Sequence, residues 1–180
     1  MHVLFLSGSP NQLSKTNAVL KVVQQSFELP YSASTINILD VPADDLMQAK
    51  FQSPAMDKVK AEIEKADILV IGSPIYKASV PGVLKALLDL LPEGALLGKV
   101  VLPVATGGSI AHYLSLNYSL LPVLHILGAT SIIKPVFVLS DHVQIENGIG
   151  RIRDPGSLRR IDEAISRLKQ SVKQASYTNV

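Results

Sequence analysis

Short apolar runs alternate five times with segments of helical periodicity, and this alternation constrains the fold more than any other feature of the chain. The run at 68–72, Ile-Leu-Val-Ile-Gly, has no polar side chain, as expected for a parallel strand covered on both faces. Strands are predicted at 2–6, 34–39, 68–72, 99–105 and 131–139, and helices at 16–27, 54–66, 81–91, 109–127 and from 157. The pattern predicts an α/β three-layer sandwich, with a parallel five-stranded sheet between two helical layers.

Composition bounds the domain count and excludes several classes of site. A length of 180 residues, 47% of them hydrophobic and 18% charged, suits one domain, predicted at 1–175 with a frayed tail at 176–180. The absence of cysteine excludes disulfides, thiol catalysis and iron–sulfur clusters. A net charge of +2 is too small to indicate nucleic-acid binding, and the four histidines lack metal-ligand spacing.

The remaining segments give expectations about location and local structure. The N-terminus leads directly into a strand, so we expect no signal peptide and a cytoplasmic location. The longest nonpolar stretch, 110–128, holds two histidines, an asparagine and a proline, which argue against a membrane span. We expect 140–156 to be irregular, with a turn at 146–148, and Ser53 and Ser157 to be helix N-caps.

The predicted sheet places three unusual loops at one edge. Ligands of such sheets bind beyond the C-terminal ends of the strands, where the strand order reverses. With the order 2-1-3-4-5, the first, third and fourth strands are neighbours. The loops that follow them, 8–17, 73–77 and 106–109, would then converge on a single crevice.

The first loop has the character of an anion site. It joins a buried strand to a helix start, where free N–H groups and the positive end of the helix dipole attract an anion. It has neither Gly-x-Gly-x-x-Gly nor Gly-Lys-Ser/Thr, which argues against a nucleotide hydrolase. The alternative is that its polar residues serve only the turn and the helix cap. The candidate phosphate-binding residues are Ser9, Asn11, Ser14, Thr16 and Asn17.

The second and third loops suggest a planar, electron-accepting ligand. Pro74 stiffens the second loop, Tyr76 offers an aromatic face, and the loop amides can bind a flat heterocycle. Two glycines in the third loop permit close approach of backbone N–H groups, which would stabilise negative charge. An ordinary strand-to-helix connection is the alternative for each loop. The candidate residues are Pro74, Ile75, Tyr76, Lys77, Thr106, Gly107, Gly108 and Ser109.

Together the three loops describe a site for flavin mononucleotide (FMN). The phosphate would lie on the first loop, and the isoalloxazine ring against the other two. Reduced flavin carries negative charge near N1, which donors in the third loop would favour. Hydride transfer onto such a ring depends on positioning, so no acid–base side chain is expected.

Several motifs resemble the NADPH-dependent FMN reductases of flavodoxin-like fold. The resemblance covers about 1–137, and within that family it is greatest to the reductases of two-component alkanesulfonate monooxygenase systems. The motifs that carry it are Gly8-Ser9-Pro10, Ser14, Pro74-Ile75-Tyr76-Lys77, the segment 81–89 and Ala105-Thr106-Gly107-Gly108. An arginine common in the family is replaced here by Asn11, for whose missing charge Lys15 is a candidate substitute, so we expect FMN binding to persist but to be weaker.

The resemblance implies hydride transfer from NADPH to FMN, with reduced FMN passed to a monooxygenase that releases sulfite from sulfonates. It also implies a homodimer or homotetramer, and a π-bulge at Tyr118 in the tetramer interface. The apolar residues of 81–91 and 109–127 exceed what one sheet contact would use, which favours a subunit interface. The expected cofactors are FMN and NADPH, with Lys77 a candidate contact for a phosphate of NADPH.

Two alternatives remain open from the sequence. One is a flavoprotein that reduces quinones, azo dyes or metal oxyanions with tightly bound FMN. The other is a flavodoxin-type electron carrier, which the sequence pI of about 8.8 and the broad apolar faces disfavour.

Overall fold

The computed structural model describes residues 1–27, 31–146 and 149–178. The main sheet is parallel and has the order β2-β1-β3-β4-β5, with β6 also paired to β4. Its strands are β1 (His2–Ser7), β2 (Ser32–Asn37), β3 (Ile68–Pro74), β4 (Val100–Gly107), β5 (Ser131–Ile132) and β6 (Val136–Leu139). The predicted α/β sandwich and strand order are confirmed.

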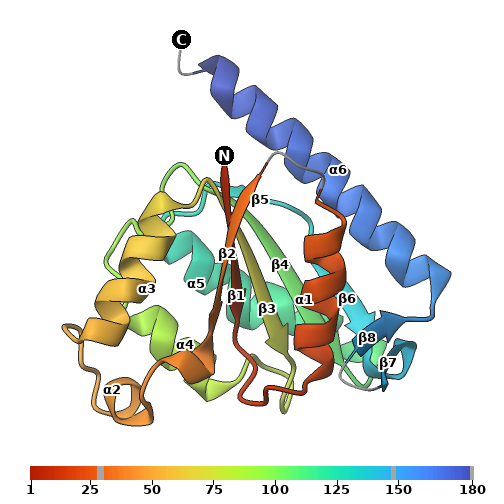
Figure 1. Ribbon diagram of the computed structural model, residues 1–180, viewed down its shortest axis with the longest axis horizontal. Coiled ribbons are helices and arrows are strands. Elements are labelled where there is room, and N and C mark those ends of the chain that lie inside the picture. The colour runs from red at the N-terminus through yellow and green to blue at the C-terminus, as the bar shows by residue number, and fades with distance from the viewer. Residues whose placement is uncertain (28–30, 147–148, 179–180) are drawn as a thin grey trace.

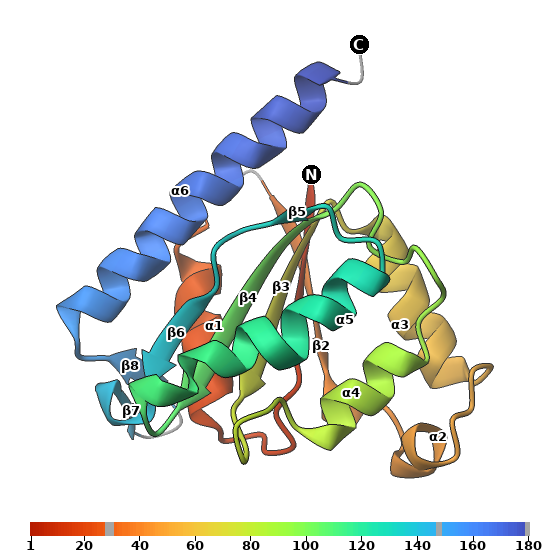
Figure 2. The same ribbon diagram turned by 180° about the vertical axis from the view of Figure 1, so that it is seen from behind.

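Helices cover both faces of this sheet (Figures 1 and 2). On one face lie α3 (Pro54–Lys65), α4 (Gly82–Asp89) and α5 (Leu121–Ile126), and on the other α1 (Lys15–Gln25) and α6 (Pro155–Thr178). Successive strand residues point to opposite faces of the sheet. Leu4 and Leu6 therefore pack in the core on the face covered by α3, α4 and α5, and Val3 and Phe5 in the core on the face covered by α1 and α6. Cover on both faces explains why the central strands β1, β3 and β4 read as continuous apolar runs, whereas the edge strand β2 is largely exposed.

Residues 131–139 were expected to form one strand, and this expectation is wrong. The chain pairs with β4 at 131–132 and again at 136–139, with Ile133, Lys134 and Pro135 between. A proline has no N–H for the ladder, which accounts for a break at this edge of the sheet. A short helix after β2, α2 (Ala43–Met47), had no periodic signal long enough to predict it.

The predicted helix 109–127 is three helical types in succession. A 3₁₀ turn, η2 (Ile110–Tyr113), leads to a π-helical turn, η3 (Leu116–Leu120), and then to α5. Tyr118 lies within the π-helical turn, where the family resemblance implies a π-bulge. Pro122 has no N–H to donate to the carbonyl of Tyr118 four residues earlier, so α-helical bonding is disfavoured at this point.

The described residues of segment 140–156 contain regular structure, contrary to the expectation of an irregular segment. A 3₁₀ turn, η4 (Ser140–His142), precedes a hairpin of β7 (Val143–Glu146) and β8 (Ile149–Ile152). The hairpin packs on α1, where a Cβ at Gly150 would lie 2.1 Å from the Cβ of Ala18. Positions 147 and 148 of the expected turn lie outside the described residues.

The last helix begins earlier than expected, because Asp154 rather than Ser157 caps it. The carboxylate of Asp154 accepts from the Ser157 N–H at 2.7 Å, and Pro155 occupies the first turn. The cap expected at Ser53 is present, accepting from the Met56 N–H. The helix continues to Thr178, and fraying of the C-terminal tail stays a prediction.

Most of the apolar residues of 81–91 serve the core of a single chain, contrary to expectation. Leu84, Leu87, Leu88, Leu90 and Leu91 are all buried. Large exposed apolar side chains lie instead along η2 to α5, at Ile110, Leu114, Tyr118 and Ile126. No helix among the described residues combines the length and apolar character needed to cross a bilayer.

Candidate functional site

The three loops predicted to converge do meet at the C-terminal edge of the sheet (Figure 1). The Gly8 N–H donates to the carbonyl of Gly72 at 2.8 Å, which joins the start of the first loop to β3. The Ile75 N–H donates to the carbonyl of Thr106 at 2.8 Å, which joins the second loop to the third. Backbone bonds therefore fix the three loops relative to one another.

Asn17 holds the first loop in shape. Its Oδ1 accepts from the Ser7 hydroxyl at 2.5 Å, and its Nδ2 donates to the carbonyls of Asn11 and Gln12. Its backbone N–H donates to Ser14 Oγ, so Ser14 is the N-cap of α1. Asn17 and Ser14 thus have structural partners within the protein, and their polar atoms are not all available to a ligand.

Ser9 and Asn11 form the turn that precedes the helix. Ser9 is fully buried, and its hydroxyl bonds to the backbone of Asn11 at 3.3 Å. Asn11 is exposed, and its Oδ1 accepts from the Leu13 N–H at 2.9 Å. The side chains predicted to bind phosphate therefore shape the loop, while the N–H groups of Lys15 and Thr16, the first two of α1, lack partners within the helix and suit an anion.

Thr16 links the first loop to the third. Its Oγ1 lies 2.6 Å from Oγ1 of Thr106, and both side chains are buried. The pair places the N-terminus of α1 against the end of β4. Because each hydroxyl already has a partner, the threonines position the loops and leave little hydrogen-bonding capacity for a phosphate.

Lys15, which the sequence offered as a substitute for the missing arginine, points elsewhere. Its Nζ donates to the carbonyl of Ser140 at 2.6 Å, at the start of the turn after β6. The loops 8–17, 73–77 and 106–109 contain no carboxylate and two cations, Lys15 and Lys77. The site therefore favours an anion mainly through backbone N–H groups and the helix dipole.

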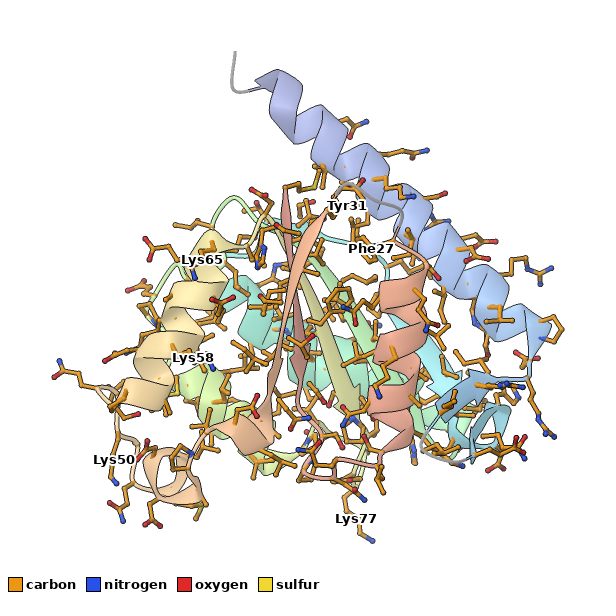
Figure 3. All side chains as sticks on the ribbon, viewed as in Figure 1. Phe27, Tyr31, Lys50, Lys58, Lys65 and Lys77 are labelled. Atoms are coloured by element: carbon orange, nitrogen blue, oxygen red, sulfur yellow. The ribbon has the colours of Figure 1, made fainter. Side chains whose placement is uncertain are left out.

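The second loop is a tight hairpin turn. Backbone bonds join Tyr76 and Ser79 in both directions, at 2.9 and 3.1 Å. The two residues at its tip, Lys77 and Ala78, have φ of 50° and 60°, as in a type I′ turn, although neither is glycine. Tyr76 is half exposed, and the Lys77 side chain points away from the body of the protein (Figure 3). Such strain in non-glycine residues is typical of functional sites.

The third loop brings backbone and an unpartnered histidine together. A Cβ at Gly107 would lie 2.8 Å from Cζ of Phe137, so this position requires glycine. Gly108 and Ser109 are exposed, and Ser109 Oγ accepts from the Ala111 N–H. Nδ1 of His112 is buried without a hydrogen-bond partner, 3.6 Å from the Cβ position of Gly107. His112 is not among the site residues predicted from the sequence, and only the fold reveals this unpartnered atom beside the loop.

The arrangement fits a bound flavin nucleotide. Backbone donors at the start of α1 suit a phosphate, the rigid second loop suits the edge of a ring, and the glycines of the third loop leave its N–H groups accessible. Among the described residues no group of three or more histidines and carboxylates could hold a metal ion. Hydrogen bonding and positioning are therefore what these residues offer.

Comparison with known proteins agrees with this geometry. Residues 1–144 match the family described as NADPH-dependent FMN reductase. The chain is 38% identical over 174 residues to an FMN reductase (NADPH) of Escherichia coli K12, covering 96% of this chain and 90% of that protein. It is 41% identical over 149 residues to an FMN reductase (NADPH) of Pseudomonas putida, covering 82% and 76%.

A solved structure shares the fold as well. The apo form of an NADH:FMN oxidoreductase, EMOB, superposes with a TM-score of 0.83 at 31% identity and covers 94% of this chain and 89% of that one. The family match spans most of the chain, and the relatives align over 76 to 90% of their own lengths. The chain therefore belongs to the NADPH-dependent FMN reductase family.

Proposed function

We propose that this chain transfers hydride from NADPH to FMN and releases the reduced flavin to a flavin-dependent monooxygenase. As a member of its family it is an oxidoreductase that uses FMN and NADPH. The convergence of loops 8–17, 73–77 and 106–109 on one edge of the sheet is the observation that carries the proposal. The monooxygenase partner, a role in sulfonate-sulfur utilisation and a cytoplasmic location rest on the motif resemblance and the sequence.

The residues of the site would act by positioning. N–H groups of the first turn of α1 would hold the phosphate, and the amides of the second and third loops would hold the ring. Bound FMN supplies the hydride-accepting centre. Tyr76, at the rim, would limit access of water to the ring face that the nicotinamide approaches. Removal of competing water and alignment of the two rings account for the expected rate enhancement without an acid–base side chain.

The first loop supports exchange of FMN as a substrate. Asn11 carries no charge, and the Nζ of Lys15 is bonded to the carbonyl of Ser140. No cationic side chain is bonded in place at the start of the helix, so binding of the phosphate would depend on backbone N–H groups and the helix dipole. These interactions are weaker than a hydrogen bond from a charged side chain to phosphate. A reductase that supplies another enzyme with reduced flavin requires such release.

A subunit interface is also proposed, on the side of the molecule formed by η3 and α5. Tyr118 and Ile126 are 81% and 80% exposed there, which is unusual for large apolar side chains of a monomer. A second copy of the chain would cover them, giving a homodimer or, with a further interface, a homotetramer.

Absorbance and steady-state kinetics test the function. The purified protein is expected to be nearly colourless, and its NADPH oxidation to rise and saturate with added FMN. Yellow protein that needs only a quinone or azo dye would replace the proposal with a tightly bound flavoenzyme. Absence of NADPH oxidation under either condition would support an electron carrier.

A further inference from the structure

A groove runs beside the outer strand of the sheet, next to the third loop. Two adjoining cavities form it, of about 490 and 70 Å³, and both are bordered by Lys134, Pro135 and Arg160. We call it the edge groove. Its larger part lies between η2, β6 and the first turns of α6, which gather on one side of the molecule (Figure 2).

The inner wall of the edge groove is aromatic and adjoins the flavin site. Tyr113 and Phe137 line it and pack edge to face, with ring centroids 6.2 Å apart. The same Phe137 ring lies against Gly107, and η2 follows the third loop directly. A ligand in the groove would therefore share a wall with the loop proposed to hold the flavin ring.

The outer rim of the edge groove is cationic. Lys134, Arg160 and Arg167 border it, against one carboxylate, Glu163. Arg160 is oriented by its own neighbours: it donates to Ser157 Oγ at 2.9 Å and lies 3.7 Å from the carboxylate of Asp154. Among the described residues neither Lys134 nor Arg167 forms an ion pair, although both border the same cavity as Glu163.

We propose that the edge groove binds the adenosine 2′-phosphate end of NADPH. The inference rests on the proposed function, because it assigns a binding site to NADPH, the second substrate of that reaction. In this arrangement the aromatic wall contacts the adenine, and Lys134 and Arg160 contact the 2′-phosphate. The nicotinamide end of the same molecule reaches toward the third loop.

Charge and shape favour this occupant. A 2′-phosphate monoester carries close to two negative charges, and the rim offers three cations against Glu163 in the rim and Asp154 beside Arg160. Arg160 has guanidinium N–H groups beyond the one given to Ser157, and arginine suits phosphate because its donors form a planar fork. A planar base suits an aromatic wall. NADH lacks the 2′-phosphate, so the cationic rim would separate the two nucleotides.

Binding of 2′,5′-ADP tests the assignment without any turnover. Calorimetric titration of the whole protein, with and without FMN, is expected to show binding of 2′,5′-ADP and at least about tenfold weaker binding of 5′-AMP. Lys134→Gln and Arg160→Gln are each expected to weaken 2′,5′-ADP binding about tenfold. Arg159→Gln, on the same helix but not lining the groove, is the matched control and is expected to change nothing. Unaltered 2′,5′-ADP affinity in Lys134→Gln, a residue with no ion pair to lose, would overturn the assignment.

Kinetics separate this inference from the proposed function. In FMN reduction, Lys134→Gln is expected to raise the KM for NADPH about tenfold while leaving kcat and the KM for NADH unchanged. Wild-type protein that oxidises neither nucleotide in the presence of FMN would refute the function itself. Wild-type protein that reduces FMN, with equal changes for NADPH and NADH in Lys134→Gln, would refute only the groove assignment.

Discussion

At the scale of single residues, the first loop is built for shape more than for charge. Asn17 closes the loop through Ser7, Asn11 and Gln12, and Ser14 caps the helix that the loop enters. Thr16 is bonded to Thr106, across to the third loop. For the proposed phosphate these side chains leave the backbone N–H groups at the start of α1, those of Lys15 and Thr16. The strength of phosphate binding should therefore respond to any charge added at the loop.

Asn11→Arg is predicted to tighten FMN binding by about a factor of ten, because a guanidinium at the exposed turn would add a charge-assisted bond to phosphate. Fluorescence titration of FMN measures the change. Gln25→Arg adds the same charge at the far end of α1 and is expected to leave FMN affinity unchanged. If Asn11→Arg binds FMN no more tightly than wild type, the phosphate does not lie at this loop.

Asp154 gives a pH-dependent contribution to stability. The Ser157 hydroxyl has the largest effect and holds the pKa of this carboxyl below its ordinary value. Burial comes next and opposes this, while the Ser157 N–H, His142 and Arg160 add to the lowering of the pKa. Because the folded-state pKa is the lower one, the stabilisation is present above the unfolded-state pKa and is lost as pH falls through the folded-state pKa.

Asp154→Asn is therefore predicted to lower the free energy of unfolding at pH 7, with the difference from wild type shrinking as the solution is acidified below the ordinary range of an aspartate. Urea unfolding across this pH range measures it. Asp162→Asn, at an exposed position of the same helix, is the control. A difference from wild type that stays constant down to low pH would contradict the charge as its cause.

At the scale of elements, the second loop stores strain in two residues. The tip of the Tyr76–Ser79 turn places Lys77 and Ala78 in the left-handed region, which costs an L-amino acid with a Cβ about 1 kcal/mol or more. The turn is nonetheless closed by two backbone bonds. Its rigidity suits an edge against which a planar ring can be positioned.

Ala78→Gly is predicted to stabilise the protein by about 0.5–1 kcal/mol, since glycine adopts positive φ without a steric penalty and only part of the gain is lost to a freer unfolded chain. Urea unfolding measures the change. Ala86→Gly, inside α4, is expected to destabilise by about 1 kcal/mol. Destabilisation by Ala78→Gly would show that the turn is not the type I′ conformation described.

The π-helical turn η3, between η2 and α5, is the second informative element. It leaves Tyr118 on a π-helical turn with its side chain 81% exposed. If a second copy covers this surface, Tyr118→Ser should weaken the assembly and lower the mass seen by light scattering toward the 19.3 kDa of one chain. Leu39→Ser, which likewise replaces a large exposed apolar side chain with serine but lies elsewhere on the chain, serves as the control. An unchanged mass and unchanged flavin retention in Tyr118→Ser would remove this residue from the interface.

Elements with long, periodic signals were predictable from the sequence, and short or interrupted ones were not. The unbroken run 68–72 and the cap at Ser53 correspond to β3 and the start of α3. The break at Lys134-Pro135, the π-helical turn before Pro122 and the β7–β8 hairpin depend on tertiary contacts, such as that of Gly150 with Ala18, which local pattern does not encode.

At the scale of the whole molecule, strand order is what assembles the site. Placing β1 between β2 and β3, with β4 next to β3, brings together loops that are about 30 to 100 residues apart in the chain. The sequence predicted this convergence because parallel strands end at a common edge. It could not predict that the polar side chains would bond to one another, because Asn17 and Thr106 find their partners only in the folded chain.

The whole-molecule view also separates two surfaces near the site. The edge groove lies between η2, β6 and α6, whereas Tyr118 and Ile126 lie further along, on η3 and α5. The first is assigned to NADPH and the second to another copy of the chain. Assembly and substrate selectivity should therefore be altered by different substitutions.

The central claim is that the protein reduces FMN with NADPH and releases the reduced FMN into solution. Anaerobic turnover followed by ultrafiltration tests this claim most directly. With catalytic protein and excess FMN, each mole of NADPH consumed is predicted to yield one mole of reduced FMN in the filtrate, free of protein. Consumption of NADPH without reduced FMN in the filtrate, or no consumption at all, would contradict the account.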